Sequence, residues 1–444
     1  MNSTVDCLTD WMTRQRWYAG KGRVPHLVGV TSETWVSPDA DARIVVHILR
    51  DLANNPPSLY HVPVVARRTV PKGMGPYLIG RDENDDYLFD GAYDPSYTSS
   101  LLRRMRVHRG DERSRVHTGE QSNTSIIFDQ GGEAPLVAKI FRLVHAGENP
   151  DVTLPSALTS RGYRQVPRML GSVTAHWDDP HNSSRMETGH LAFAQEFVQD
   201  VRDGWELALE TAARGDEFTV EAERLGATTA VVHRGLAEAM PIRPATLGDI
   251  VGFVAGWHQR LAVATSDVPA LRELRPAIEA VYDAAQDAPW PALQRIHGDY
   301  HLGQVLRRSS GDWVLVDFEG EPLRPLDERT RVDSPLRDVA GMLRSFDYVV
   351  GSRQNTAVDD NARAAVDTGW SHRARAAFLD GYIRESEIDL RAHRALLDAF
   401  ELDKAVYEAM YEARNRPGWL PIPLGAVRHL VSDGRASARP VADP

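Results

Sequence analysis

The sequence is poor in cysteine: among its 444 residues there is one, Cys7. A single cysteine forms no internal disulfide and supplies no cysteine-based metal framework, which is typical of proteins from reducing compartments. The chain also lacks an apolar run of the ~18 residues that a membrane helix needs. Its first residues show no basic stretch followed by an apolar run, so they predict no signal peptide. We therefore expect a cytoplasmic protein without a membrane partner.

Basic residues are fewer than acidic ones, with 51 Lys and Arg against 62 Asp and Glu, and the formal charge is −11. This balance argues against a general nucleic-acid binder, although it leaves room for a local basic pocket. Charged residues make up 25% and hydrophobic residues 42%, as in ordinary globular proteins. The length allows two or three structural units with a sizeable core.

The patterning predicts an α+β protein of three units. Residues 1–110 mix helical and alternating patterns, 111–200 are rich in strands separated by Gly-containing turns, and 201–444 are mainly helical. The expected helices are 5–17, 223–240, 247–265, 373–386 and 393–415. The expected strands are 43–49, 60–69, 136–141 and 191–198, with a hairpin at 305–320 and a loop at 84–96, which is rich in Asp, Asn, Gly and Pro.

The segment RIHGDYHLGQ (295–304) carries the strongest chemical signal. Asp299 lies two residues after His297 and five before Gln304, and a short apolar stretch ends at Asp317. Phosphoryl transfer needs a carboxylate that accepts the proton of the attacking hydroxyl and oxygen ligands for magnesium. Asp299 suits the first role, while Gln304 and Asp317 offer the amide and carboxylate oxygens that magnesium prefers. We expect His297 to brace this loop by hydrogen bonds.

A nucleotide-binding segment is expected before this loop. Lys139 stands among apolar neighbours in LVAKIF, where a buried ammonium is costly unless it meets an anion such as the α- and β-phosphates of a nucleotide. Within GEQSNTS, a turn that offers backbone N–H groups and hydroxyls to phosphate oxygens, the candidates are Gly119, Ser122, Asn123, Thr124 and Ser125. Backbone groups of Glu196 and Val198 are the candidates for adenine binding.

Five segments together resemble the actinobacterial maltokinases of the aminoglycoside-phosphotransferase class. They are QRWYAGKGR, GEQSNTS with VAKIFR, HGDYHLGQ, VDFEGEP and YEARNRPGWLPIPL. The resemblance implies a bilobal kinase-like fold, with 1–110 as an N-terminal cap, 111–200 as the nucleotide-binding N-lobe and 201–444 as the C-lobe. It implies ATP and Mg²⁺ as cofactors, maltose as the acceptor, and maltose 1-phosphate as a product that feeds α-glucan synthesis. The resemblance is compatible with a protein that is a monomer, and with one that associates with enzymes of α-glucan synthesis.

Sugar binding needs carboxylates and amides for hydroxyl groups and aromatic rings for the apolar sugar faces. The candidates are His297, His301, Glu319, Glu321, Arg324, Tyr411, Glu412, Arg416 and Trp419. His301 either lines the site or supports it. Glu408 and Glu412 lie four apart on one helix face and could instead be solvated surface. We expect Arg337 and Asp338 to tie the site loops to the following helix.

Several alternatives remain open. The acidic partner of Lys139 is undecided, with Glu148 and Asp151 nearby. The segment 15–23 either packs the cap or approaches the nucleotide-side loop. The chain could phosphorylate glucosamine on the same scaffold, or be a nucleotide-binding pseudokinase. A hydrolase that uses Glu319 and Glu321 is the weakest alternative.

Overall fold

The computed structural model describes residues 3–108, 110, 112–117, 122–131, 133–179, 182–321, 324–357, 359, 366–386 and 388–437. Contacts divide the chain into two compact units. The N-terminal unit comprises Met1–Ser156 and Pro167–Val198, and the C-terminal unit comprises Ala157–Val166 and Gln199–Pro444. The expected division into three parts stays a prediction.

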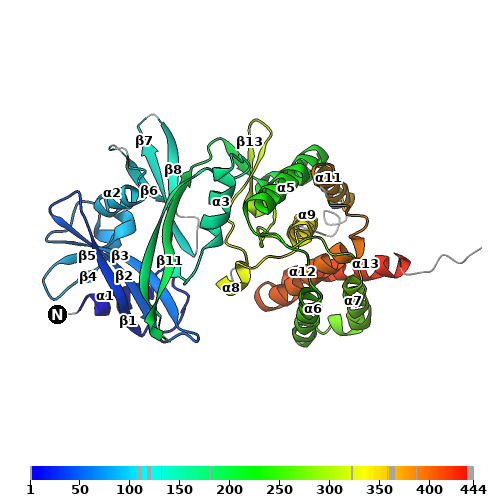
Figure 1. The fold of residues 1–444 in the computed structure, drawn as a ribbon, viewed down its shortest axis with the longest axis horizontal. Helices are drawn as coiled ribbons and strands as arrows, with labels where there is room; N and C mark the ends of the chain where they lie inside the picture. The colour runs from blue at the N-terminus through cyan, green and yellow to red at the C-terminus, as the bar shows by residue number, and fades with distance from the viewer. Residues whose placement is uncertain are drawn as a thin grey trace, which may run out of the picture. The chain divides into compact units, whose positions relative to one another are not determined.

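The N-terminal unit is built on two antiparallel sheets (Figure 1). The first has the strand order β1 (Leu27–Trp35), β2 (Ala42–Asp51), β3 (Ser58–Arg67), β5 (Tyr87–Asp90) and β4 (Leu78–Arg81), and β9 (Leu143–Val144) also pairs with β3. The second has the order β10 (Met169–Asp179), β11 (Asn182–Glu196), β8 (Glu133–Phe141), β7 (Asn123–Gln130) and β6 (Arg113–His117). The helices are α1 (Thr4–Met12), α2 (Pro95–Arg104) and α3 (Pro150–Ser160), whose last four residues belong to the C-terminal unit. There are also two 3₁₀ turns, η1 (Gly75–Tyr77) and η2 (Gly91–Tyr93).

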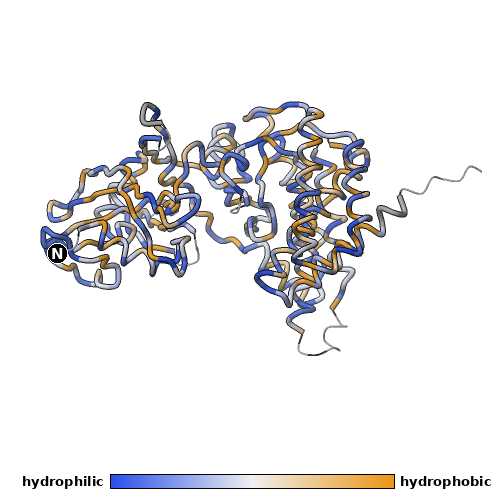
Figure 2. Tube along the Cα trace, turned by 90° about the horizontal axis from the view of Figure 1, so that it is seen from below, coloured by the Kyte–Doolittle hydropathy of each residue, from blue (hydrophilic) through white to orange (hydrophobic). Residues whose placement is uncertain are grey.

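One hydrophobic core joins residues of both sheets. Trp35 and Tyr97, from the expected cap, pack in the same buried cluster as Ile126 and Trp177 from the expected N-lobe. Strand β2 contributes alternate residues to this core, from Ala42 to Ile48, because every second side chain of a strand points to the same face of the sheet. Figure 2 shows hydrophobic residues recurring along strands and helices, as such a distributed core requires.

Three expectations for the N-terminal unit are wrong in part. The helix expected at 5–17 is shorter, since α1 ends at Met12. The loop expected at 84–96 contains β5, η2 and the start of α2. The carboxylates of Asp90 and Asp94 accept hydrogen bonds from the first turns of η2 and α2, so the polar residues here cap helices. The turn expected at 119–125 ends earlier, because Asn123–Ser125 already belong to β7.

The segment 15–23 packs into the N-terminal unit. Trp17 and Tyr18 are buried, and the Tyr18 hydroxyl donates to a carboxylate oxygen of Asp51 on β2 at 2.8 Å. The guanidinium of Arg142, just after β8, lies 5.0 Å from the centre of the Trp17 ring. These contacts favour the packing role over a role at the nucleotide-side loop.

Arg142 connects the two sheets of this unit. It is fully buried, forms two hydrogen bonds to the carboxylate of Asp90 on β5 at 2.8 and 2.9 Å, and donates Nε to the Thr124 hydroxyl on β7 at 2.9 Å. Burial, and then the Arg142 charge, lower the pKa of the nearby His61 to about 3, so that imidazole is neutral at pH 7. Arg142 is therefore the cation that compensates Asp90.

The C-terminal unit is mainly helical, with a small sheet in the order β12 (Val201–Asp203), β13 (Val305–Arg308) and β14 (Trp313–Leu315). Its longer helices are α4 (Gly204–Arg214), α5 (Thr219–Ala239), α6 (Leu247–Asp267), α7 (Leu271–Gln286), α9 (Leu336–Thr356), α11 (Gly369–Glu385), α12 (Arg394–Asn415) and α13 (Pro421–Ser437). Shorter elements are α8 (Leu326–Arg329), η3 (Leu302–Gln304) and η4 (Pro417–Trp419). The four helices predicted in this region and the hairpin at 305–320 are confirmed.

Local chemistry explains where these helices begin and how closely they pack. Thr246 and Asp249 form a reciprocal capping box that starts α6. Helices α5 and α11 meet at Gly226 and Gly381, where an added Cβ would come within 1.9 Å of a facing carbonyl oxygen. Only glycine permits this approach.

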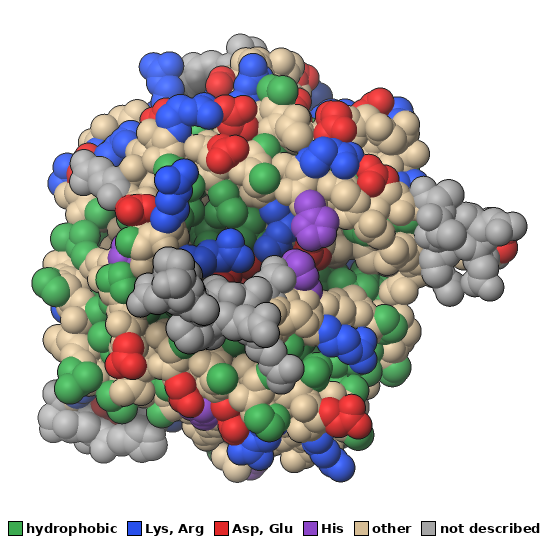
Figure 3. Space-filling model, turned by 90° about the vertical axis from the view of Figure 1, so that its right-hand side faces the viewer, with side chains coloured by type: hydrophobic (Ala, Val, Ile, Leu, Met, Phe, Trp, Pro, Cys, Tyr) green, Lys and Arg blue, Asp and Glu red, His purple; other side chains and the backbone are tan. Residues whose placement is uncertain are grey.

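None of the helices in the described parts of the chain has the length and hydrophobicity of a membrane span. Figure 3 shows one face of the molecule, on which acidic and basic side chains are interspersed and several basic ones gather in a central hollow. The acidic excess of the sequence is therefore not collected on this face.

Candidate active site

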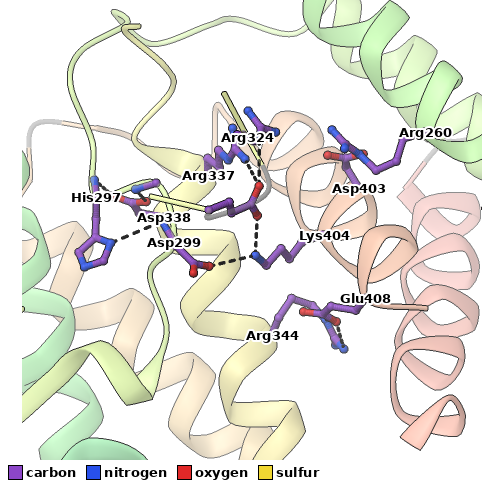
Figure 4. A network of polar contacts seen from close by, with 12 residues as sticks. Arg260, His297, Asp299, Arg324, Arg337, Asp338, Arg344, Asp403, Lys404 and Glu408 are labelled. Carbon is purple, nitrogen blue, oxygen red and sulfur yellow. Dashed lines mark hydrogen bonds and ion pairs between the residues drawn. The ribbon is translucent and has the colours of Figure 1, made fainter. Parts of the chain in front are cut away.

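The loop that carries Asp299 is held by the start of α9. The carboxylate of Asp338 accepts hydrogen bonds from the backbone N–H groups of His297 at 2.8 Å and Gly298 at 2.9 Å (Figure 4). The same carboxylate lies 3.1 Å from Nε2 of His233 on α5, and it is fully buried. Asp338 thus ties the loop to the following helix, as the sequence predicted.

His297 joins this loop to the segment after β14. Its Nε2 lies 2.9 Å from the Val316 carbonyl oxygen, and its ring packs against Phe318 with centres 4.6 Å apart. Gly298 adopts a φ of +85°, and a Cβ there would meet the Cα of Gly320 at 3.4 Å. The two segments therefore approach through a glycine pair, and His297 braces them.

Gln304 and Asp317 are side by side. The Gln304 side-chain amide nitrogen lies 3.2 Å from a carboxylate oxygen of Asp317. Asp317 has a φ of +64°, a conformation that aspartate tolerates better than most residues and that clusters at functional sites. The carboxylate and, with the amide turned over, the amide oxygen form a hard-oxygen pair that suits Mg²⁺.

A charged cluster surrounds Asp299 (Figure 4). Nζ of Lys404, on α12, lies 2.7 Å from the Glu321 carboxylate and 3.5 Å from the Asp299 carboxylate. Burial by itself lowers the pKa of Lys404, but Glu321 and Asp299 outweigh it and raise the pKa, so the ammonium stays charged. Glu321 also binds Arg324 and Arg337, each at 2.9 Å.

Glu321 is held as a carboxylate. Burial alone raises its pKa, yet its three cationic partners overcome this effect and keep the pKa well below the usual range. A carboxylate that stays ionised cannot donate a proton near neutral pH. This geometry disfavours the hydrolase alternative, which needs Glu321 in a paired acid–base role.

A cavity of about 900 Å³ opens beside Asp299, and we call it the aromatic cavity. Its aromatic wall consists of Trp205, Tyr348, Tyr407, Tyr411 and Trp419. Its charged residues are Asp203, Glu206, Asp299, Lys404, Glu408, Glu412 and Arg416. His301 also lines it. Ligand sites have this size and this combination of rings and a few polar groups.

The carboxylates of α12 that line the aromatic cavity are already paired. Glu412 is 1% exposed and binds the Arg416 guanidinium at 2.6 and 2.9 Å. Glu408 binds the buried Arg344 at 2.9 Å. Arg416 also stacks over the ring of Trp419 at 4.7 Å. The interpretation of Glu408 and Glu412 as solvated surface is therefore wrong.

The predicted sugar-site residues divide into two groups. Tyr411, Glu412, Arg416, Trp419 and His301 line the aromatic cavity together with Asp299. His297, Glu319, Glu321 and Arg324 do not line the aromatic cavity, and their role as sugar contacts stays a prediction. Of these four, Glu321 and Arg324 line a smaller cavity that also includes Asp299.

His301 both lines the aromatic cavity and supports its loop. Its Nδ1 accepts a hydrogen bond from the backbone N–H of Gly303 at 3.1 Å, which caps η3. Burial lowers the pKa of His301, so the imidazole is neutral near pH 7. A neutral imidazole still offers a hydrogen bond to a ligand hydroxyl.

In the N-terminal unit, Lys139 has an acidic partner. Its Nζ lies 2.8 Å from the carboxylate of Asp151, in the first turn of α3. Both side chains are largely buried. Of the two candidates in the sequence, the structure thus pairs Lys139 with Asp151.

The other predicted nucleotide residues have mixed outcomes. Gly119 lies outside the described residues. The Thr124 hydroxyl is engaged by Arg142. Ser122 is exposed, whereas Asn123 and Ser125 are buried in β7. Their roles stay predictions.

For the adenine contacts, the backbone N–H of Glu196 already donates to the Arg168 carbonyl at 2.9 Å. The backbone group of Glu196 that could still bind adenine is therefore its carbonyl oxygen. Val198 is buried, and its backbone role also stays a prediction.

Sequence reasoning missed Lys404. Its signal was the spacing of Lys404, Glu408 and Glu412, three ionisable residues four apart in a helix with apolar neighbours. Asp203 and Trp205, at the start of α4, were missed because no motif marks them.

Comparison with known proteins places these features in a family. Residues 115–396 match the model of a phosphotransferase enzyme family. The chain belongs to that family. Residues 11–94 of this phosphotransferase match the maltokinase N-terminal cap domain, which confirms the resemblance to maltokinases.

Two curated relatives are named glucosamine kinases, not maltokinases. The phosphotransferase is 30% identical over 343 residues to a glucosamine kinase of Mycolicibacterium smegmatis, covering 72% of this chain and 80% of the relative. It is 29% identical to a glucosamine kinase of Streptacidiphilus jiangxiensis, covering 68% and 70%. A solved structure of a glucosamine kinase in complex with glucosamine, ADP and inorganic phosphate matches with a TM-score of 0.65 and 22% identity, over 95% of this chain and 98% of that chain. The α+β kinase-like fold with an N-terminal cap is thereby confirmed.

Proposed function

We propose that this phosphotransferase is an ATP-dependent sugar kinase that phosphorylates maltose at its anomeric hydroxyl and yields maltose 1-phosphate. The observation that carries the proposal is the position of Asp299 at the wall of a large cavity rich in aromatic side chains. Aromatic rings suit the apolar faces of sugars, and a carboxylate beside them can accept the proton of an attacking hydroxyl.

Each proposed role follows from a local arrangement. Asp299 takes the proton of the sugar hydroxyl as the phosphoryl group is transferred. Gln304 and Asp317 would hold Mg²⁺, which neutralises the phosphates of ATP. Lys139, oriented by Asp151, would bind the α- and β-phosphates.

The charges beside Asp299 support a neutral acceptor. Glu408 and Glu412 are already paired with arginines, and Asp299 has the ammonium of Lys404 at 3.5 Å. An amino sugar carries a cation, which Lys404 would repel beside Asp299, whereas Asp203 and Glu206 of the same cavity could receive it only at another position. The five rings of the wall also exceed what one sugar ring can cover, which supports a disaccharide.

Glucosamine is the second candidate acceptor. The relatives named glucosamine kinases favour it, since one is 30% identical over 72% of this chain. The amino group would then bind Asp203 or Glu206, or it would replace the arginine partner of Glu408 or Glu412.

An acceptor panel decides between the two sugars. With saturating Mg²⁺ and ATP, we expect maltose to give the highest kcat/KM among maltose, glucose and glucosamine, measured by ADP release. Preference for glucosamine would reject maltose and keep the kinase assignment. Nucleotide binding by calorimetry without turnover on any sugar would instead support the pseudokinase.

We also expect Lys139→Met to lower kcat/KM for ATP by about 10- to 100-fold, because hydrogen bonds to charged groups contribute ~1.5–3 kcal/mol. The initial rate at varied ATP measures this effect. The matched control is Lys72→Met, which removes an exposed lysine of the same unit. Equal kinetics in both variants would show that Lys139 does not bind the phosphates.

A further inference from the structure

A second cavity of the C-terminal unit, of about 590 Å³, lies along α6, and we call it the arginine cavity. Three guanidinium groups line it, from Arg260, Arg324 and Arg337. Phe253 and Trp257 of α6 add aromatic side chains to the lining. Nothing in the proposed kinase reaction uses this cavity.

The arginines have donors left for a ligand. Arg260 donates Nε to Asp403 at 2.7 Å, and Arg324 donates Nε to Glu321 at 2.9 Å. Among the described residues, no hydrogen-bond acceptor meets the Nη groups of either arginine. In each guanidinium, the N–H groups of Nη1 and Nη2 therefore stay available to donate hydrogen bonds to an anion.

The charges here favour an added anion. The carboxylate of Glu321 serves Arg324, Arg337 and Lys404 together, and Arg337 also binds Asp333 at 2.8 Å. Burial and then the neighbouring Arg337 lower the pKa of Arg324, while Glu321 and Asp333 act in the opposite direction. An anion beside Arg324 would relieve this repulsion.

We propose that the arginine cavity binds a phosphate monoester of a small ring compound, such as a sugar phosphate, at a site separate from the aromatic cavity. Two guanidinium forks from different elements, α6 and the segment before α8, suit a phosphate group, whose three terminal oxygens exceed the two of a carboxylate. Phe253 and Trp257 offer an apolar surface to the ring. The inference does not depend on which sugar the kinase phosphorylates.

Glycines of α6 allow a clean steric test. Gly256 lines the arginine cavity, and a Cβ built there meets no atom within 4 Å. In Gly256→Leu, the new side chain therefore enters the arginine cavity without a backbone clash. The substitution should not weaken α6, because leucine forms helices better than glycine. Gly248→Leu is the matched control, since Gly248 lies on the same helix outside the lining and has room for a Cβ.

The experiment is calorimetric titration of the full chain with glucose 1-phosphate, without nucleotide or Mg²⁺. We expect binding that weakens at least about 10-fold in Gly256→Leu and in Arg260→Lys, and that is unchanged in Gly248→Leu. Arg260→Lys keeps the positive charge beside Asp403 but removes the paired N–H donors of the guanidinium. The variant therefore tests whether binding of the phosphate needs two parallel hydrogen bonds or only a positive charge.

Titration with inorganic phosphate distinguishes the source of the phosphate group. Binding as tight as that of glucose 1-phosphate, with the same loss in Gly256→Leu, would support the site with free phosphate as its ligand. Absence of binding to both probes would overturn the proposal. So would binding that Gly256→Leu leaves unchanged, because the probe would then occupy the kinase site instead.

Discussion

Replacing Asp299 by asparagine is expected to lower kcat by at least ~100-fold, the usual contribution of a general base. Asparagine keeps the size of the side chain but cannot accept the proton of the sugar hydroxyl. The loop should keep its place, because Asp338 holds it through the backbone N–H groups of His297 and Gly298. Steady-state kinetics at saturating ATP and sugar measure the effect.

The control for this variant is Asp312→Asn, which removes an exposed carboxylate from the turn between β13 and β14. It should retain the natural kcat. A near-normal rate in Asp299→Asn would remove Asp299 from the role of base. Calorimetry should show that Asp299→Asn still binds nucleotide, so that loss of activity is separated from loss of structure.

Replacing Arg142 by methionine is expected to reduce the free energy of unfolding by about 3–5 kcal/mol, the cost of leaving one partner of a buried ion pair alone. Arg142 is fully buried and compensates Asp90 through two hydrogen bonds. Methionine fills similar volume but leaves the Asp90 carboxylate charged and uncompensated. Urea unfolding followed by tryptophan fluorescence measures the change, since Trp17 lies under this guanidinium.

A double variant separates charge from packing. Asp90→Asn with Arg142→Met removes the buried carboxylate but keeps the side-chain oxygen that caps η2. It should recover part of the stability lost in Arg142→Met, because neither partner is then left charged. Arg103→Met, an exposed change on α2, should stay within about 0.5 kcal/mol of the natural chain. If Arg142→Met also stays within that range, the buried pair does not hold the two sheets together.

The order of the motifs predicted much of the candidate site. Lys139, Asp299, Gln304 and Asp317 stand in recognisable local patterns, because each role needs a particular residue type at a particular spacing. The helices of the C-terminal unit were equally visible, since their burial follows the 3.6-residue period. The prediction of a loop at 84–96 was wrong because aspartates are common both in loops and at the N-caps of helices, so composition alone does not separate the two.

Contacts between distant segments could not be predicted in this way. Lys404 stands 83 residues after Glu321, yet the two side chains meet at 2.7 Å. Arg344 and Glu408 are 64 residues apart and pair in the same manner. No local pattern encodes such partners, because they depend on how the loop after β14, α9 and α12 pack together.

By itself, the sequence determined the chemical class of this protein. The spacing around Asp299 and Asp317 and the buried position of Lys139 indicate phosphoryl transfer, since a general base, a metal ligand and a phosphate-binding cation are local requirements. Only the tertiary structure decided the environment of the base. It placed a charged lysine beside Asp299 and paired Glu408 and Glu412 of the aromatic cavity with arginines, because charge compensation in a buried site depends on which side chains the fold brings within a few ångströms.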